Sequence, residues 1–338
     1  MLNRRRRYEE KLRERDLPPP DARTLEYLHH IVDEGTLGAN NHVRLIQDLF
    51  LHLSEQITAA DTRWRVMTLT RDFVEQTRGA DTPIISNAMN WLLRGIDRDA
   101  DGDMCQVLEA RIRKWAVESK TRTKRLVSTG KHLLADCSTI LLFDYSSTVS
   151  TLISAVCAER RPLPKIVVFE SRSINGGLPY LRDLLANDIR VTFLPDVAID
   201  FACSEADAVL LGVESFRCDG SLVNTIGSRL VARTATQHGA KVYGCCDFFK
   251  LDLRSYDGTF KNPTLRSFSN LLAHADYGEM VQDANCEAQS IDTTCPELEV
   301  VPPEALTGFI TERGFVPPQA VWQLGRAPSR GGVEALDE

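Results

Sequence analysis

The stretch "TILLFDYSSTVSTLISAVCAERRPLPKIVVFE" at residues 139–170 decides the fold. Two short apolar runs rich in β-branched residues, TILLF and KIVVFE, flank a segment long enough for a helix. Three similar runs follow: "RVTFLP" at 190–195, "DAVLLGVE" at 207–214 and "KVYGCC" at 241–246. Strands that alternate with helix-length segments pair in parallel through right-handed crossovers. The sequence therefore predicts a doubly wound α/β sheet.

Residues 22–135 differ in texture, because their apolar residues recur three and four positions apart, as on one face of a helix. "HVRLIQDLFLHLSEQI" at 42–57 is an example. We interpret "PPEALTGFITERGFVPPQAVWQL" at 302–324 as a final helix between proline-bearing turns. Four parts are expected: a basic arm at 1–20, a helical domain at 21–135, an α/β ligand-binding domain at 136–325 and a disordered tail at 326–338.

Charge and hydropathy favour a globular protein with no general attraction to nucleic acid or to a membrane. Forty basic residues stand against forty-seven acidic ones, which gives a net charge of -7. "NRRRRYEEKLRERD" at 3–16 is locally basic and ends at Pro18–Pro20. We interpret it as a short, partly helical arm followed by a rigid break; it is either a solvated tail or an RNA-binding arm, and we favour the tail. Because the start lacks a secretory signal and no run is long enough to span a membrane, we expect a cytoplasmic protein.

Metal and cofactor motifs are missing from the sequence. The nine cysteines include no C-x-x-C pair and no histidine partner at zinc-like spacing. Neither the phosphate-loop motif nor G-x-G-x-x-G occurs. We therefore expect no metal and no cofactor.

Polar residues follow each predicted strand, where ligands bind in sheets of this type. These are Asp144 with Ser146, Ser147 and Thr148, then Glu170 with Arg172, Asp196, Glu214, and Asp247 with Lys250. A strand that leads into a helix leaves free N–H groups that attract phosphate, and the three hydroxyls would add donors. Ser and Thr are also ordinary helix caps. Phosphate binding and plain capping both stay open for residues 146–148.

The stretch "GVESFRCDGSLVNTIGSRLVA" at 212–232 is more specific. It resembles the signature of the translation initiation factor 2B alpha/beta/delta subunit family, which also contains ribose-1,5-bisphosphate isomerase and methylthioribose-1-phosphate isomerase. Five other segments agree in order and spacing: "TRGADTPIISNAMNWLL" at 77–93, "ILLFDYSSTV" at 140–149, "VVFESRSINGG" at 167–177, "CCDFFKLD" at 245–252 and "PPEALTGFITERGFVPPQAV" at 302–321. The resemblance covers residues 22 to 324.

The resemblance implies a helical N-terminal domain on a Rossmann-like domain, a homodimer or dimer-based hexamer, and a phosphorylated sugar as ligand. It implies a ligand site made of Gly38, Ala39, Asn40, Arg78, Ser146, Ser147, Thr148, Arg172, Asn224, Thr225 and Lys250. Arg78 and residues 146–148 would bind phosphate, Asn224 would contact the sugar, and Lys250 would meet a second anionic group. The alternatives are solvent-exposed cations at Arg78 and Lys250, and an internal salt bridge between Arg172 and Glu170.

The sequence departs from the family at the positions that carry its chemistry. The isomerases use a cysteine and an aspartate, and Asp144 and Glu214 stand at those positions, while Thr225 replaces a common lysine. Two carboxyl groups with separated pKa values can move the protons of an aldose–ketose interconversion. We therefore expect a sugar-phosphate isomerase with Asp144 and Glu214 as its acid–base pair. The alternatives are a non-catalytic regulatory subunit that binds a sugar phosphate or nucleotide and a protein partner, and a dimeric module with a vestigial pocket.

Overall fold

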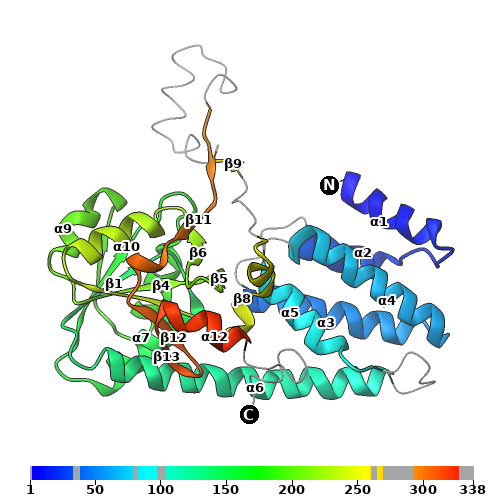
Figure 1. Ribbon diagram of the computed structural model, residues 1–338, viewed down its shortest axis with the longest axis horizontal. Coiled ribbons are helices and arrows are strands. Elements are labelled where there is room, and N and C mark those ends of the chain that lie inside the picture. Colours follow the sequence, from blue (N-terminus) through cyan, green and yellow to red (C-terminus); the bar gives the residue numbers. More distant parts are fainter. Residues whose placement is uncertain are drawn as a thin grey trace.

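A computed structural model describes residues 2–32, 39–79, 82–96, 104–259, 265–268 and 292–326. Figure 1 shows the helical domain on the right and the α/β domain on the left, with the long helix α6 (Met104–Leu133) running along the lower side of both. Among the described residues, no helix combines the length and the apolar character that a membrane span requires.

The helical domain is built from amphipathic helices around one apolar core. Its elements are α1 (Leu2–Glu14), α2 (Ala22–Val32), α3 (Ala39–Gln56), α4 (Ala60–Val74), the π-helical turn η1 (Glu75–Gly79), α5 (Pro83–Leu93) and the first half of α6. Proline suits the first turn of α5, where its missing N–H would have no partner. The helical prediction for this part of the chain is confirmed.

The basic arm is not a solvated tail. Residues of the arm form helix α1, which lies on α4, and its Tyr8 and Leu12 are buried in the helical core. The Tyr8 hydroxyl lies 2.7 Å from Thr70 Oγ1, and burial raises the pKa of Tyr8 to about 12. The expectation of a tail failed because two apolar side chains four residues apart are enough to dock a helix whose other faces are charged.

The central sheet has seven strands in the order β13-β12-β7-β4-β1-β2-β3. Its strands are β1 (Thr139–Phe143), β2 (Lys165–Phe169), β3 (Val191–Leu194), β4 (Ala208–Gly212), β7 (Lys241–Cys245), β12 (Gly308–Thr311) and β13 (Gly314–Val316). All pairs are parallel except β12 with β13. The five predicted strands are confirmed, and so is the doubly wound, Rossmann-like class.

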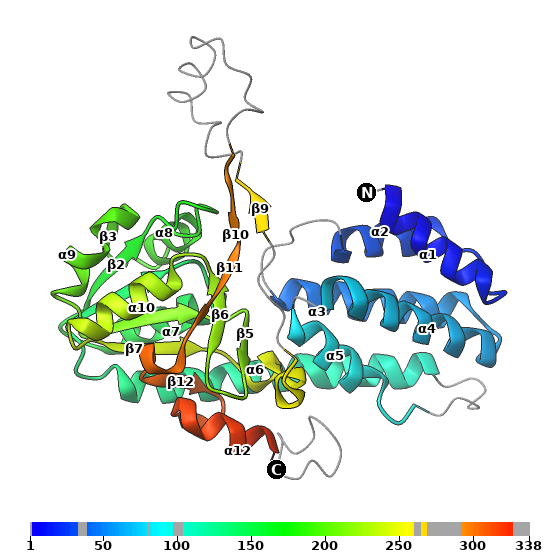
Figure 2. The same cartoon turned by 45° about the horizontal axis from the view of Figure 1, so that its top comes forward.

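Helices cover both faces of this sheet, as Figure 2 shows. Ile140 and Leu142 pack with α7 (Ser147–Glu159), α8 (Leu178–Leu185) and the second half of α6. Leu141 and Phe143 point to the other face and pack with α9 (Ile199–Cys203) and α10 (Ser228–Gln237). Because both faces are buried, the strands read as continuous apolar runs rather than alternating ones.

A second, four-stranded sheet, absent from the sequence prediction, has the order β11-β6-β5-β8. It comprises β5 (Ser215–Arg217), β6 (Leu222–Thr225), β8 (Leu251–Asp252) and β11 (Leu298–Val301), and a separate ribbon pairs β9 (Leu265–Ser267) with β10 (Thr294–Pro296). Short 3-10 turns complete the fold: η2 (Asp196–Ala198), η3 (Phe248–Lys250), η4 (Leu253–Asp257), η7 (Pro303–Ala305) and η8 (Pro318–Ala320).

The final helix predicted over 302–324 is wrong for most of its length. Residues 308–316 form the β12–β13 hairpin, and helix α12 covers only Val321–Arg326. Gly314 closes the turn with a φ of +105°, which an L side chain rarely adopts. The glycine-bearing turn between two short apolar runs is a hairpin signal, and it outweighs the helical spacing. Most of the predicted tail, residues 327–338, lies outside the described residues.

Candidate functional site

The two predicted catalytic residues follow neighbouring strands at the point where the strand order reverses. Strand β1 pairs with β2 on one side and with β4 on the other, and Asp144 follows β1 while Glu214 follows β4. In doubly wound sheets the crevice at the carboxyl ends of such strands is the usual ligand site. The topology therefore brings both carboxyl groups to one place.

Asp144 is buried and held by neighbours from three segments. Its φ of +58° lies in the left-handed region, which aspartate tolerates better than most residues. Its backbone N–H donates to Ser171 Oγ at 2.8 Å, and its Oδ2 accepts a 2.6 Å hydrogen bond from Thr225 Oγ1. Asp144 thus follows β1, its backbone is held by the loop after β2, and its side chain is held by β6.

Burial makes Asp144 a weaker acid than an ordinary aspartate. The pKa of Asp144 is raised from 3.8 to about 6, mainly by loss of solvation and also by the nearby charges of Glu214 and Glu297, while the hydrogen bonds from Thr225 and from the Tyr145 N–H lower it. A carboxyl group with such a pKa can both hold and release a proton near neutral pH.

Gly176 makes room for the Asp144 carboxyl group. A Cβ atom at position 176 would lie 2.0 Å from Asp144 Oδ1 and 3.1 Å from its Cγ. No side chain fits in that space, so the loop between β2 and α8 requires glycine here. The Asp144 carboxyl therefore lies directly against the backbone of this loop.

Glu214 connects the sheet to the helical domain. Its Oε1 accepts a 2.8 Å hydrogen bond from Thr82 Oγ1, at the start of α5, and its backbone N–H donates to the Val223 carbonyl at 2.9 Å. Lys250 Nζ donates to the carbonyl of Val213, the residue before Glu214. Glu214 and Lys250 thus share a half-buried location between the two domains.

The serine-rich turn divides its groups between capping and free donors. Ser146 is the N-cap of α7, where its Oγ accepts from the Val149 N–H, and its own N–H donates to Tyr180 Oη at 3.1 Å. The N–H groups of Ser147 and Thr148 have no hydrogen-bond partner in the described part of the chain. The structure therefore assigns capping to Ser146, and the N–H groups of residues 147 and 148 stay available to a ligand.

Asn224 and Thr225 lie side by side on β6 and are both buried. Asn224 Nδ2 donates to Ser228 Oγ at 3.0 Å, and its Oδ1 lies close to Gly212. A Cβ at Gly212 would lie 2.8 Å from Ser146 Cβ, so this glycine allows the turn after β1 to approach β4 closely. Asn224, Ser146 and the Asp144–Thr225 pair are thus neighbours.

The three cations predicted for the site, Arg78, Lys250 and Arg172, differ in their contacts. Arg78 is half-buried, and its Nε is fully buried without a hydrogen-bond partner among the described residues, so the alternative of an exposed cation is wrong. Lys250 is half-buried as well. Arg172 forms no ion pair with Glu170 within the described ranges. Its backbone N–H donates instead to Asp196 Oδ2 at 2.8 Å.

The early ligand loop is only partly described. Ala39 and Asn40 begin helix α3, and nothing is described of their side chains. Gly38 lies outside the described residues. These three assignments stay predictions.

The N-terminus of α10 is already occupied by a carboxylate of the chain. Glu299 Oε1 accepts from the N–H groups of Gly227 at 2.7 Å and Arg229 at 2.9 Å, and its Oε2 pairs with Arg229 Nε at 3.3 Å. This leaves the α7 N-terminus as the better anion site.

Sequence reasoning did not assign roles to several residues that shape the site. They are Thr82, Asn87, Ser171 and Gly176, all within quoted segments, and Asp196, noted only as a residue at a strand end. Asp196 accepts the N–H groups of Ser171 and Arg172, so it shapes the loop after β2. Their roles depend on contacts between distant segments, which spacing along the chain does not reveal.

A cavity of about 580 Å³ lies elsewhere, between α1 and α2. Arg4, Arg5, Arg6, Glu9, Glu26 and His29 line it together with apolar residues. None of the predicted site residues lines this cavity, and two of its arginines have structural roles: Arg4 donates to the Val32 carbonyl and Arg5 pairs with Glu9. The region around Asp144, Glu214 and Lys250, which we call the interdomain site, contains a buried carboxyl and is chemically the stronger candidate for a functional site.

Described residues include no group of three or more His, Cys, Asp and Glu side chains placed to hold a metal ion. What the interdomain site does contain is a buried carboxyl, a second carboxyl near it, free helix N–H groups and the half-buried Lys250. This set can bind an anion and exchange protons with a neutral part of the same ligand.

Known proteins resemble this chain over most of its length. A ribose 1,5-bisphosphate isomerase from Haloterrigena turkmenica is 25% identical over 242 residues, which is 72% of this chain and 74% of that protein. The crystal structure of the translation initiation factor eIF-2B from Pyrococcus horikoshii has a TM-score of 0.72 at 22% identity and covers 88% of this chain and 98% of its own. That of 5-methylthioribose 1-phosphate isomerase from the same organism has a TM-score of 0.67 at 18% identity and covers 89% and 86%.

The family model of the initiation factor 2 subunit family matches residues 40–318. This range includes the helical domain from α3 onward, the whole central sheet and both candidate catalytic carboxyls. The chain therefore belongs to the initiation factor 2 subunit family.

Proposed function

We propose that this protein is a sugar-phosphate isomerase that interconverts the aldose and ketose forms of a phosphorylated pentose-type sugar. The observation that carries the proposal is the buried Asp144 carboxyl, whose pKa of about 6 is maintained by burial and by nearby Glu214. The named isomerase activity of a relative that covers 72% of this chain supports the same reaction class.

In this reaction Asp144 and Glu214 act as a general acid–base pair. One carboxylate removes the proton from the carbon next to the carbonyl of the open-chain sugar, and the other carboxyl gives a proton to the carbonyl oxygen. The second carboxylate then takes a proton from the other hydroxyl group of the resulting enediol. The first carboxyl group gives its proton to the former carbonyl carbon. Both groups end in their starting protonation states, so the cycle needs no external oxidant or metal.

The ligand's phosphate meets the donors around the acid–base pair. Ser147 and Thr148 offer free N–H groups at the α7 N-terminus, while Arg78 and Lys250 bring positive charge. We assign Asn224 and Thr225 to the sugar side of the site, and Arg172, with Gly38, Ala39 and Asn40, to its rim. Charge-assisted contacts of about 1.5–3 kcal/mol each would give micromolar binding from a few such groups.

Turnover is tested with a panel of aldose and ketose phosphates in deuterated water, followed by NMR. The expected result is conversion of at least one phosphorylated pentose with deuterium on carbon. Asp144→Asn and Glu214→Gln should each lower the rate by at least about 100-fold, as expected for the loss of a general acid or base. Glu205→Gln, which changes an exposed carboxylate paired with Lys165, is the matched control and should leave turnover unchanged.

The second candidate is a non-catalytic regulatory subunit that binds a sugar phosphate or nucleotide and a protein partner. It is favoured by the hydrogen bonds that already engage both carboxyls: Thr225 on Asp144 and Thr82 on Glu214. Calorimetry distinguishes the two candidates. Clear binding of a sugar phosphate with no conversion of any compound would establish the regulatory role and overturn the enzyme.

The assembly proposed for this protein is a homodimer or a dimer-based hexamer. Its support is an exposed apolar surface on η2, α9 and α10, made of Val197 (93% exposed), Phe201 (65%) and Leu230 (59%). Isolated apolar side chains are common on surfaces, and we take these three as a candidate interface because η2 and α10 both pack against α9. Homo-oligomers most often form through two-fold symmetric contacts.

A further inference from the structure

The segment that carries Lys250 belongs to the α/β domain but is anchored in the helical domain. Phe249 is 1% exposed and is part of the helical core. Its ring lies edge-on to Trp115, with ring centroids 4.5 Å apart, and the Arg122 guanidinium lies 4.6 Å from its centre. Asp247 at the start of the segment pairs with Arg122 of α6 at 3.5 Å. The helical domain therefore holds one side of the segment 247–251, while Phe248 and Leu251 pack in the core of the α/β domain.

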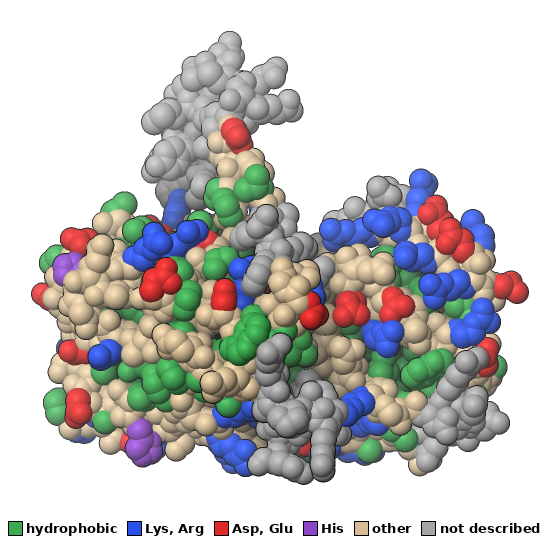
Figure 3. All heavy atoms as spheres, in the orientation of Figure 1, with side chains coloured by type: hydrophobic (Ala, Val, Ile, Leu, Met, Phe, Trp, Pro, Cys, Tyr) green, Lys and Arg blue, Asp and Glu red, His purple; other side chains and the backbone are tan. Residues whose placement is uncertain are grey.

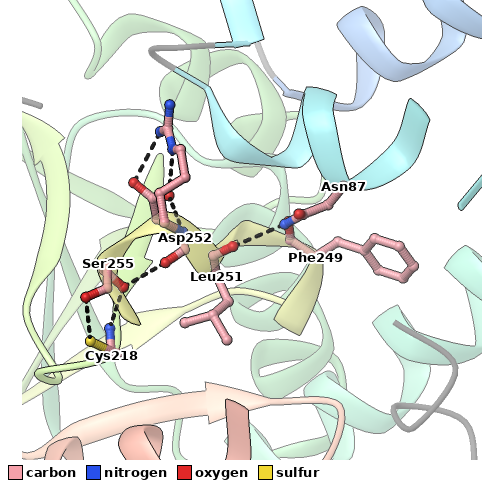
Figure 4. Close-up of polar contacts among 7 residues, drawn as sticks. Asn87, Cys218, Phe249, Leu251, Asp252 and Ser255 are labelled. Atoms are coloured by element: carbon pink, nitrogen blue, oxygen red, sulfur yellow. Dashed lines mark hydrogen bonds and ion pairs between the residues drawn. The ribbon is translucent and has the colours of Figure 1, made fainter. Parts of the chain in front are cut away.

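Asn87 of α5 binds this segment on both sides of Lys250. The side chain is 6% exposed, and its Nδ2 donates to the Phe249 carbonyl at 2.7 Å and to the Leu251 carbonyl at 2.9 Å. Figure 4 shows the Asn87 side chain pointing at this turn from the neighbouring helix. An amide has two N–H hydrogens, so one side chain satisfies the carbonyls of Phe249 and Leu251, the residues on either side of Lys250.

The same helix also holds the other charged group of the interdomain site. Thr82 directly precedes α5 and donates to Glu214 Oε1, while Lys250 Nζ donates to the carbonyl next to Glu214. The residue before this helix thus contacts the candidate Glu214, and Asn87 within the helix contacts the two neighbours of the candidate Lys250.

We propose that Asn87 is a positioning residue that fixes Lys250 in the interdomain site through the carbonyls of the residues on either side of it. The inference rests on the proposed function only for the identity of the anion that Lys250 meets. Without the two hydrogen bonds, the ammonium keeps its charge but is no longer held at one distance from a bound phosphate.

The first test needs no ligand. Lysines are acylated with a trace of acetic anhydride, and mass spectrometry gives the rate at each residue in the wild type, in Asn87→Ala and in Asn87→Asp, which keeps the shape but removes both donors. Lys250 should react at least about threefold faster in both variants, because a lost hydrogen bond frees its backbone. Lys165 should be unchanged, which separates a local effect from partial unfolding. Asn90→Ala, an exposed asparagine of the same helix, is the matched control.

The second test is a double-mutant cycle on the affinity for ribose 5-phosphate and for inorganic phosphate, measured by calorimetry. Asn87→Ala should weaken binding about fivefold when Lys250 is present and should have little further effect in the Lys250→Met background, because both changes remove one interaction. Additive effects, or an unchanged Lys250 acylation rate in Asn87→Ala, would overturn the inference. If no phosphate compound binds the wild type, the proposed function fails, and the acylation rates alone decide the role of Asn87.

Discussion

At the scale of single residues, the burial of Asp144 has an energetic consequence that can be measured. Its pKa is about 6 in the folded protein against an ordinary value of 3.8, so the folded state holds this proton more tightly than the unfolded chain does. The stability that the protonated group contributes is fully present below pH 4 and is lost as the pH rises through 6. A shift of this size corresponds to about 3 kcal/mol.

Asp144→Asn should remove this pH dependence. Between pH 4 and 6 the unfolding free energy of the wild type should fall with a slope that is steeper than that of the variant by up to about 1.4 kcal/mol per pH unit, the limit for one proton. Urea unfolding at half-unit steps from pH 4 to pH 7 gives both slopes. Parallel curves for the two proteins would show that folding does not raise the pKa of this carboxyl.

At the scale of elements, the loop between β2 and α8 determines where the Asp144 carboxyl lies. Gly176→Ala places a methyl group where Asp144 Oδ1 now lies, and overpacking of this kind costs about 1–3 kcal/mol. Turnover should fall well beyond what that loss of stability explains. Gly239→Ala is the matched control, because Gly239 has a positive φ but open space around it. Equal activity losses in both variants would contradict the assigned role of the loop.

Local patterns identify some elements of this protein and miss others. The runs of β1, β2, β4 and β7 are recognisable because these strands are apolar and buried on both faces, whereas β3 is a partly exposed edge strand. The strands of the second sheet have only two to four residues, too few for a periodic signal. The spacing of apolar residues predicts a helix over residues 308–316, because a single glycine, Gly314, is a weak sequence signal for the hairpin turn.

The candidate site shows the same division. Asp144, Glu214 and the serine-rich turn were found because they directly follow apolar runs. Thr82 is separated from Glu214 by 132 positions and Asn87 from Phe249 by 162, so only the fold brings them together. Helix capping and phosphate binding are both possible for Ser146 from the sequence, and the hydrogen bond from the Val149 N–H to its Oγ shows capping.

At the scale of the whole molecule, the exposed apolar surface of η2, α9 and α10 predicts self-association. Burial of a Val or Phe side chain contributes about 1.5–3 kcal/mol, so Val197→Asp should weaken a dimer by at least about tenfold. Sedimentation equilibrium measures the change. Leu163→Asp, which changes an exposed leucine just before β2, is the control. A wild type that stays monomeric at high concentration, or a dimer indifferent to Val197→Asp, would exclude this surface as the interface.

Mixed charge over the rest of the surface fits this picture. Figure 3 shows basic and acidic side chains interspersed on the visible face, over the helical domain above all, rather than one continuous basic area. On this face, the described side chains therefore form no continuous basic area that would attract nucleic acid.

The rate of deuterium transfer from solvent to sugar carbon, measured against pH, tests the acid–base pair most directly. In the wild type the rate should change through an ionisation near pH 6, the pKa of the buried Asp144, and it should fall by at least about 100-fold in Asp144→Asn. No deuterium on any sugar phosphate at any pH, or incorporation that survives in Asp144→Asn with Glu214→Gln, would contradict an isomerase built on these two carboxyls.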